Sequence, residues 1–223
     1  MTAPTSSAEF DRAYRAPLTA WGDVRIPEEV KALAGAGSPR RSLELGCGVG
    51  RISRYLAGRG LEAVAIDFSP VAIDKARERA SRDAAQPTYL VGDVTRLDAV
   101  QGPFDIALDV GCFHCLTPDQ QRGYVSEIDR LLAPGGTHLI WALDATPSDL
   151  RLSPAAMKDI FGPRLELREA RASRRRIAAS HWYWLTRASH AADSSAESPY
   201  ASGASSSSQL DHHSRRTKTS SLA

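Results

Sequence analysis

Three glycines at alternate positions could bring the backbone of this chain close to a ligand. Gly46, Gly48 and Gly50 follow an apolar run that contains Glu44, and Arg51 opens a segment with helical spacing. Glycine has no Cβ, so the chain can turn tightly there, and the free N–H groups of the helix would point into the same crevice. A dinucleotide-binding turn has its third glycine where Arg51 stands, and the Gly-Lys-Ser/Thr of a P-loop is absent. The pattern predicts a ligand-binding turn of another kind, and a glycine turn without a ligand is the alternative.

Two aspartates follow predicted strands, at the edge where open α/β sheets bind ligands. Asp67 comes after the apolar run 63–66, about 20 residues beyond the glycine turn, where a βαβ nucleotide site has its ribose-hydroxyl acceptor. Asp67 could instead cap the next helix, although Ser69 is also a suitable cap. Asp93 follows a third apolar run, 89–91.

A further group of reactive side chains comes at the end of the apolar segment 104–110: Asp109, Cys112, His114 and Cys115. His114 titrates near neutral pH and is a candidate base or hydrogen-bond donor, with a structural histidine bonded to a backbone carbonyl as the alternative. The two thiols could form a redox pair or bind a metal, for which Cys47 and His114 are conceivable further ligands. We expect no metal, and we take His114 and Asp109 as the candidate catalytic residues.

Strands and helices that alternate along the chain must position these residues. Five apolar runs are predicted strands: 42–45, 63–66, 89–91, 104–110 and 137–143. Helices are predicted at 9–14, 28–34, 51–57, 71–80 and 117–132, and Pro134-Gly135-Gly136 is predicted as a tight turn into the fifth strand. The alternation predicts a Rossmann-like, doubly wound α/β sheet that is mostly parallel. After a helix at 153–161, the runs 165–167 and 181–185 predict an antiparallel hairpin at the sheet edge.

The composition divides the chain into three parts. Residues 1–38 form a predicted N-terminal helical arm or lid, with a disordered lead-in at 1–9 and a capping or cofactor-contacting aromatic at Trp21. Residues 39–187 form the predicted ligand-binding domain. Residues 188–223 are rich in serine and poor in apolar side chains, so burial cannot offset the entropy of ordering them, and we predict a disordered tail.

The overall composition narrows the classes of function. The chain has 223 residues, 42% hydrophobic and 24% charged, which fits one globular domain with an appendage. Its net charge of +2 is too small to indicate a nucleic acid or a membrane as partner. It has no apolar run long enough to span a bilayer, no apolar core of a secretory signal near Met1, and too few cysteines for a disulfide framework. We therefore expect a cytoplasmic protein, of unknown oligomeric state.

Over residues 40–145 the chain resembles the class I S-adenosylmethionine-dependent methyltransferases. Five motifs have the family's order and spacing: Glu44-x-Gly46-x-Gly48-x-Gly50, Ile66-Asp67-Phe68-Ser69, Gly92-Asp93-Val94, Phe104-Asp105 and Leu132-Ala133-Pro134-Gly135-Gly136. The resemblance implies S-adenosyl-L-methionine as cofactor and a seven-stranded sheet whose last strand is antiparallel. It implies that the three glycines approach the adenosine and methionine moieties and that Glu44 lies near the methionine amino group. It also implies that Asp67 binds the ribose hydroxyls, that Phe68 lies against the adenine, and that Asp93 and Val94 meet the exocyclic edge of the adenine.

The end of the fourth strand indicates the class of methyl acceptor. Enzymes of this family that methylate amino groups of nucleic acids carry Asn/Asp-Pro-Pro-Tyr/Phe there, and those that methylate a cytosine carbon carry Pro-Cys. Asp109-Val110-Gly111-Cys112 is neither. The chain is instead similar to the small-molecule enzymes near the thiopurine, thiol and halide group, in its Asp-x-Gly-x-Phe-His pattern at 109–114, its Trp-containing N-terminal arm and its Arg-Leu-Leu-x-Pro-Gly-Gly turn at 130–136. The resemblance implies in-line methyl transfer to a sulfur, oxygen or nitrogen atom of a small molecule. An RNA- or protein-directed enzyme, favoured if residues 171–176 formed a basic face, and a methyltransferase fold that binds without catalysis are the alternatives.

Overall fold

The described part of the chain folds around one seven-stranded sheet. The computed structural model describes residues 6–16, 25–37, 41–145, 151–173 and 178–189, and these lie in the compact unit Met1–His190. The strands are β1 (Arg41–Leu45), β2 (Glu62–Asp67), β3 (Thr88–Val91), β4 (Phe104–Val110), β5 (Leu132–Leu143), β6 (Leu165–Ala172) and β7 (Ser180–Arg187).

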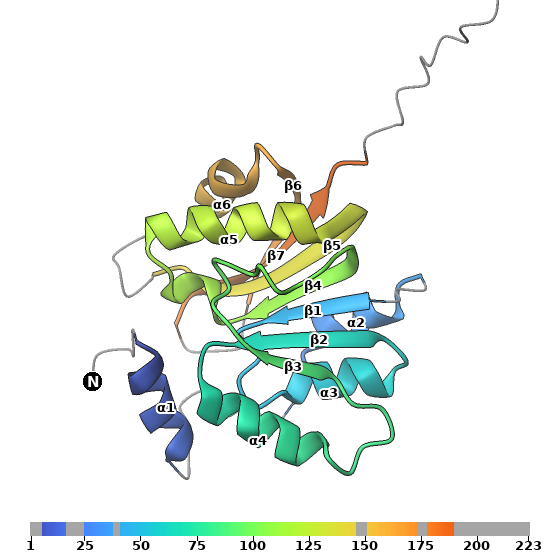
Figure 1. Cartoon of the computed structure of the whole chain (residues 1–223). Helices are drawn as coiled ribbons and strands as arrows, with labels where there is room; N and C mark the ends of the chain where they lie inside the picture. Colours follow the sequence, from blue (N-terminus) through green and yellow to red (C-terminus); the bar gives the residue numbers. More distant parts are fainter. Residues whose placement is uncertain (1–5, 17–24, 38–40, 146–150, 174–177, 190–223) are drawn as a thin grey trace, which may run out of the picture. The chain divides into compact units, whose positions relative to one another are not determined.

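The strand order is β3-β2-β1-β4-β5-β7-β6 (Figure 1). Strands β1 to β5 pair in parallel, and β7 runs antiparallel to both β5 and β6. The order reverses between β1 and β4, which is the topological switch point of a doubly wound sheet. The predicted Rossmann-like sheet with an antiparallel hairpin at its edge is confirmed.

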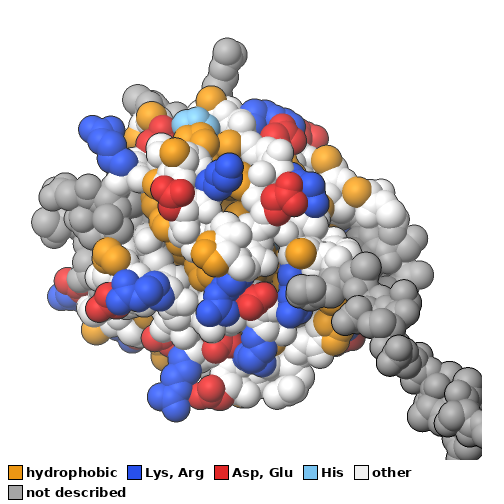
Figure 2. All heavy atoms as spheres, turned by 90° about the horizontal axis from the view of Figure 1, so that it is seen from above, with side chains coloured by type: hydrophobic (Ala, Val, Ile, Leu, Met, Phe, Trp, Pro, Cys, Tyr) orange, Lys and Arg blue, Asp and Glu red, His pale blue; other side chains and the backbone are white. Residues whose placement is uncertain are grey.

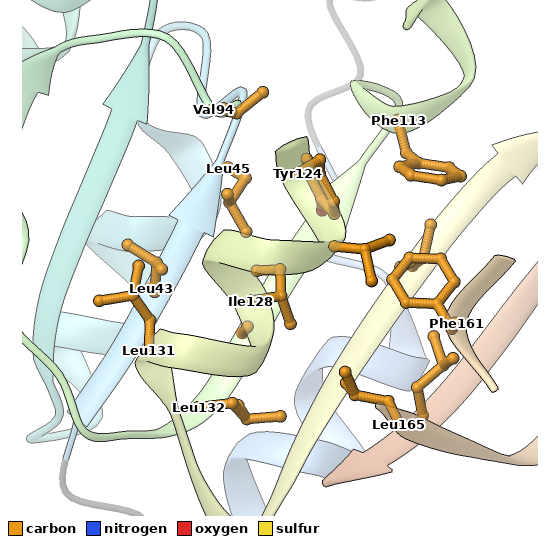
Figure 3. Packing of buried hydrophobic residues seen from close by; sticks show 14 of the residues in the cluster. Leu43, Leu45, Val94, Phe113, Tyr124, Ile128, Leu131, Leu132, Phe161 and Leu165 are labelled. Atoms are coloured by element: carbon orange, nitrogen blue, oxygen red, sulfur yellow. The ribbon is translucent and has the colours of Figure 1, made fainter. Parts of the chain in front are cut away.

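Helices cover both faces of this sheet. α5 (Pro118–Leu131) and α6 (Pro154–Phe161) lie on one face, and α2 (Glu28–Gly35), α3 (Arg51–Gly58) and α4 (Pro70–Ala80) lie on the other (Figure 1). On the α5 face, Tyr124 and Ile128 belong to one buried cluster with Leu45 of β1 and Phe161 of α6 (Figure 3). Because both faces are covered, most side chains of the central strands are buried, including the polar Glu44 of β1 and Asp109 of β4.

The helix after the glycine turn has no side-chain cap of its own. Gly50 is the N-cap residue of α3, and the carboxyl group of Glu44 bonds to the first turn from β1. Oε2 of Glu44 accepts a hydrogen bond from the backbone N–H of Ser53 at 2.8 Å. By contrast, α4 begins at the side-chain cap Ser69, as predicted, and α5 begins at the side-chain cap Thr117. The buried Glu44 therefore joins β1 to α3 across the turn.

The structure differs from the predicted boundaries most clearly at α1, β5 and β6. α1 (Ser7–Arg15) begins within the segment predicted as disordered, because Ser6 and Glu9 form a capping box. β5 already begins at Leu132, so Pro134-Gly135-Gly136 lies inside the strand, where the β4–β5 register shifts, and not in a turn before it. β6 extends to Ala172 and is longer than the predicted 165–167.

Several predictions concern residues outside the described part of the chain. They are those for Trp21, for Arg174, Arg175 and Arg176, and for nearly all of the serine-rich segment. Among the described residues, no helix has both the length and the apolar character to cross a membrane.

Candidate active site

The parallel strands bring the candidate residues to one edge of the sheet. Gly46 follows β1, Asp67 ends β2, Asp93 comes shortly after β3, and Gly111 follows β4. α1 lies at the same edge (Figure 1). Open α/β sheets bind ligands at this edge, so the fold groups residues that the sequence holds in separate motifs.

The glycine turn packs tightly against other parts of the chain. Its glycines all have a positive φ, 68° at Gly46 and 73° at Gly50 among them. A Cβ at Gly46 would lie 2.5 Å from the Cβ of Cys112, and a Cβ at Gly50 would lie 2.4 Å from the hydroxyl oxygen of Tyr89. Both the backbone conformation and the neighbouring side chains therefore require glycine. At Gly48 the neighbour is Tyr14 of α1, 2.8 Å from a Cβ placed there.

Glu44 lies buried beside this turn, with 4% of its surface exposed. Burial raises the pKa of Glu44 to about 8, although the hydrogen bond from Ser53 acts in the opposite direction. The carboxyl group therefore holds its proton at neutral pH in the free protein. A cation placed next to it would favour the ionised form, so this group can exchange a proton for a positively charged ligand atom.

Asp67 connects the end of β2 to the glycine turn. One carboxylate oxygen accepts the backbone N–H of Gly48 at 2.8 Å, and the other accepts the backbone N–H of Ser69 at 2.9 Å. The cap of α4 is Ser69, and Asp67 bonds to that cap residue. Burial raises the pKa of Asp67. The result is a carboxylate fixed in orientation beside the turn, with lone pairs left for further donors.

Phe68 is an exposed aromatic side chain, and α1 packs beside it. The Phe10 ring meets it edge-on at a centroid distance of 5.0 Å, and the Ser7 hydroxyl donates to the Phe68 carbonyl oxygen at 2.9 Å. Asp11 and Ser69 are also hydrogen-bonded through their side chains. The sequence predicted a helix at 9–14 but not these contacts, because they join positions far apart in the chain.

The side chains of Asp93 and Val94 have different surroundings. Oδ1 of Asp93 accepts the backbone N–H and the hydroxyl of Thr95, at 2.8 and 2.7 Å. Val94 is buried in the cluster beneath α5 (Figure 3). A ligand at this strand end would therefore meet the Val94 backbone and not its side chain.

The fully buried Asp109 organises the loop after β4. Its carboxylate accepts the backbone N–H groups of Gly111, Cys112 and Phe113 at 3.1, 2.8 and 3.0 Å, and the Tyr124 hydroxyl at 2.9 Å. Burial raises the pKa of Asp109 to about 6, against the effect of these bonds. All four donors belong to the protein and the side chain has no exposed surface. These contacts favour a role in positioning the loop, and the catalytic role of Asp109 stays a prediction.

His114 is held as a neutral ring with one defined tautomer. Burial lowers the pKa of His114 to about 4, and its Nδ1 accepts the backbone N–H of Leu143 at 3.4 Å. The remaining proton is therefore on Nε2. His114 can donate a hydrogen bond, but Nε2 has no lone pair with which to take up a proton. Of the two predicted roles, the geometry supports the donor.

The paired thiols of the same loop are protonated at neutral pH. Burial raises the pKa of Cys115 to about 11 and that of Cys112 well above its usual range. The thiolate is the reactive form of cysteine, so burial disfavours a reactive role for these two side chains. Within the described ranges, no three His, Cys, Asp or Glu side chains gather in a way that could hold a metal ion.

One ionisable pair at this edge was missed from the sequence. Nδ1 of His181, in β7, lies 2.6 Å from Oδ1 of Asp144, the residue that follows β5. About a quarter of each side chain is exposed. The two residues lie far apart in the sequence and come together only because β5 pairs with β7. A periodic pattern of residues could therefore not predict the pair.

Comparison with known proteins points to one family. Residues 43–136 match the family described as "Methyltransferase domain". A 2-heptyl-1-hydroxyquinolin-4(1H)-one methyltransferase of Mycobacteroides abscessus is 33% identical over 111 residues, which are 48% of this chain and 49% of that protein. A ubiquinone biosynthesis O-methyltransferase of Xanthomonas campestris pv. campestris is 34% identical over 140 residues, which are 61% of this chain and 56% of that protein. The chain thus spans about half the length of these relatives.

The fold has counterparts among solved structures. The N-methyltransferase NodS from Bradyrhizobium japonicum, crystallised with S-adenosyl-L-homocysteine, superposes with a TM-score of 0.70 and 20% sequence identity. The superposition covers 82% of this chain and 99% of NodS. At that identity the similarity concerns the fold.

Proposed function

We propose that this chain, which carries a methyltransferase domain of the class I fold, transfers the methyl group of S-adenosyl-L-methionine to a small-molecule acceptor. The observation that carries the proposal is the hydrogen bond between the Asp67 carboxylate and the Gly48 N–H. It joins the Asp67 carboxylate to the glycine turn at the carboxyl edge of the sheet, which supports a site for an adenosine-bearing cofactor. The matched family, over residues 43–136, supports the same assignment.

The cofactor is S-adenosyl-L-methionine, and its parts find partners along this edge. Asp67 accepts the ribose hydroxyls, and Phe68 lies against the adenine. Asp93 and the Val94 backbone meet the exocyclic edge of the adenine. The turn of Gly46, Gly48 and Gly50 faces the adenosine and methionine moieties through its backbone. Glu44 gives up its proton to pair with the methionine ammonium group.

The acceptor side is formed by the ends of β4 and β5. The Nε2–H of His114 donates a hydrogen bond to the acceptor, and Asp109 holds the loop that carries His114. A sulfonium methyl group is already activated, so the protein mainly aligns a nucleophile with the S–C bond and excludes water. Residues 1–38 act as an arm or lid over the cofactor, residues 39–187 as the catalytic domain, and residues 188–223 stay predicted as a disordered tail.

The acceptor is a small molecule with a sulfur, oxygen or nitrogen nucleophile. Two relatives are named for a hydroxyquinolinone and for ubiquinone biosynthesis, which supports a compact ring system. The predicted place near the thiopurine, thiol and halide group stays a prediction. A screen of thiols, phenols, amines and bulk RNA with methyl-labelled S-adenosyl-L-methionine tests the class of acceptor.

An RNA-directed enzyme is the second candidate, since a tRNA N(3)-methylcytidine methyltransferase of Schizosaccharomyces pombe is 28% identical over 171 residues. The described surface gives it little support. Arg171 pairs with Glu169 at 2.7 Å, and its guanidinium lies over the Trp184 ring. On the face seen in Figure 2, Lys and Arg side chains alternate with Asp and Glu. Methylation of bulk RNA, with none of the small acceptors, would favour this second candidate.

Replacing Asp67 with alanine is expected to weaken binding of S-adenosyl-L-methionine by about 1–3 kcal/mol, the effect of leaving buried polar partners unmatched. Titration calorimetry measures the affinity. Asp98→Ala is the matched control, because Asp98 is exposed and its ion-pair partner Arg96 is exposed as well. An unchanged affinity in Asp67→Ala, or tight binding of NADH to the wild-type protein, would contradict the cofactor assignment.

A further inference from the structure

The Asp144–His181 pair joins strand β7 to the residue directly after β5, and backbone hydrogen bonds fix both ends. His181 stands opposite Ala142 in the β5–β7 ladder, and its ring stacks on Tyr183 at a centroid distance of 5.8 Å. The backbone of Asp144 is fixed on both sides, since its N–H donates to the Ala179 carbonyl oxygen and its own carbonyl oxygen accepts the Leu152 N–H. The carboxylate and the imidazole are therefore held in one relative orientation.

The contact between the two side chains defines the tautomer of His181. A carboxylate accepts hydrogen bonds, so the Nδ1 of His181, at 2.6 Å from Asp144 Oδ1, carries the proton. The lone pair of the neutral ring is then on Nε2. A carboxylate that holds Nδ1–H also stabilises the imidazolium that forms when Nε2 takes up a proton.

The other two described histidines cannot serve as bases. His114 carries its proton on Nε2, and its Nδ1 is occupied by the Leu143 N–H. His138 is fully buried between the Tyr124 hydroxyl and the Ala107 carbonyl oxygen. Among the described histidines, only His181 combines partial exposure with a lone pair directed away from a fixed carboxylate.

The pair lies beside the acceptor end of the proposed site. Leu143, whose N–H bonds to His114, is followed directly by Asp144. His114 and the Asp144–His181 pair thus bracket the end of β5. A donor and a base on either side of one strand end are the groups that a protic nucleophile needs.

We propose that His181, oriented by Asp144, is the general base that deprotonates a hydroxyl acceptor during methyl transfer. The inference rests on the proposed function and adds the chemical class of its acceptor. Nε2 of His181 takes the hydroxyl proton as an oxygen lone pair forms the new O–C bond. The S–C bond breaks, and its electron pair stays on sulfur. The products are a methyl ether, neutral S-adenosyl-L-homocysteine and an imidazolium that returns its proton to water.

A general base at this position favours an acceptor whose nucleophilic atom is oxygen over one whose nucleophilic atom is sulfur. A phenolic hydroxyl has a pKa of about 10 and is almost entirely protonated at neutral pH, whereas a thiol, at about 8.5, is already partly ionised. Removal of the proton during transfer therefore matters most for a hydroxyl group. The Nε2–H of His114 is then free to orient the acceptor through a second polar atom.

Two conservative variants test the pair, His181→Gln and Asp144→Asn, with Asp98→Asn as the matched control at an exposed ion pair. Methyl transfer is measured with phenol, 1-naphthol, thiophenol and 4-nitrophenol, which is ionised near neutral pH. For the protonated phenols, His181→Gln is expected to lower kcat about 10²–10⁴-fold, the usual contribution of a general base. Transfer to 4-nitrophenolate and the affinity for S-adenosyl-L-methionine should stay close to wild type in the same variant.

The role of Asp144 has a separate spectroscopic readout. In the wild-type protein, ¹⁵N NMR of the His181 ring is expected to show the Nδ1–H tautomer. Asp144→Asn should shift the ring toward Nε2–H and lower kcat for phenols with it. A merely structural role would leave kcat for phenols unchanged although the tautomer shifts.

The outcomes separate this inference from the proposed function. Wild-type protein that fails to bind S-adenosyl-L-methionine would overturn the proposed function itself. Protein that binds the cofactor but methylates no phenol, or a His181→Gln variant with undiminished kcat on phenol, would overturn the role of His181 alone. An Nε2–H tautomer in the wild-type protein would do the same.

Discussion

Replacing Asp109 with alanine is expected to lower the free energy of unfolding by about 3–6 kcal/mol. The variant removes the common acceptor of three backbone N–H groups and the Tyr124 hydroxyl. Each buried donor left without an acceptor costs about 1–3 kcal/mol, and relaxation of the loop relieves part of the sum. Because a domain of this kind is stable by about 5–15 kcal/mol in total, the loss would be a large share of its stability.

Urea denaturation at pH 7 measures the effect, with two comparison variants. Tyr124→Phe removes one of the four donors and should destabilise by much less than Asp109→Ala. Asp98→Ala, at an exposed carboxylate, should change the free energy of unfolding by less than about 0.5 kcal/mol. A loss below 1 kcal/mol in Asp109→Ala would show that the loop does not depend on this carboxylate.

The contribution of Glu44 to the stability of the free protein is expected to fall as the pH rises from about 4.5 to about 8, through the ionisation of its carboxyl group. The pKa of Glu44 is raised to about 8 in the folded state by burial, while in the unfolded chain it returns to about 4.3. Between these values the folded state binds the proton and the unfolded state does not. The contribution is therefore fully present below about 4.5 and is lost as the pH rises through about 8, at roughly 1.4 kcal/mol per pH unit.

Glu44→Gln isolates this contribution, because the amide oxygen can still accept the Ser53 N–H. The lowered pKa values of His114 and His138, both about 4, make stability rise with pH between about 4 and 6.5. The quantity to measure is thus the difference between wild type and Glu44→Gln in urea denaturation at pH 5, 6, 7 and 8. Glu62→Gln is the control, since Glu62 is exposed and paired with Arg41. Parallel pH curves for wild type and Glu44→Gln would contradict the assignment.

Local patterns in the sequence predicted most of the fold. The apolar run Ala63–Ile66 and the Ser69-Pro70 start of α4 each depend on neighbours along the chain, and both predictions were confirmed. The start of β5 was wrong, because Pro134-Gly135-Gly136 reads locally as a turn and only pairing with β4 keeps it in the strand. The predicted start of α1 was also wrong. The many polar residues near the N-terminus indicated disorder, and the capping box of Ser6 and Glu9 was overlooked.

The sequence predicted which residues lie at the candidate site better than it predicted the role of each residue. The sequence placed Asp109 near the methyl-transfer end but could not show that its oxygens are fully occupied by its own loop and by Tyr124. For His114, the tautomer follows from the Leu143 N–H, a group on another strand. Asp144 and His181 meet only through the β5–β7 pairing. Their spacing in the sequence therefore gave no basis for predicting the contact.

The position of β7 makes assembly of the sheet depend on the end of the described chain. β7 is the last of the described strands to leave the ribosome, yet it lies between β5 and β6, and β6 joins the described sheet only through it. Until Ser180–Arg187 are available, the β5 edge stays open during synthesis, and open edges of this kind invite pairing with other chains. The nascent chain is therefore most exposed to aggregation after β5 and before β7, and insertion of that single strand both closes the edge and completes the Asp144–His181 pair.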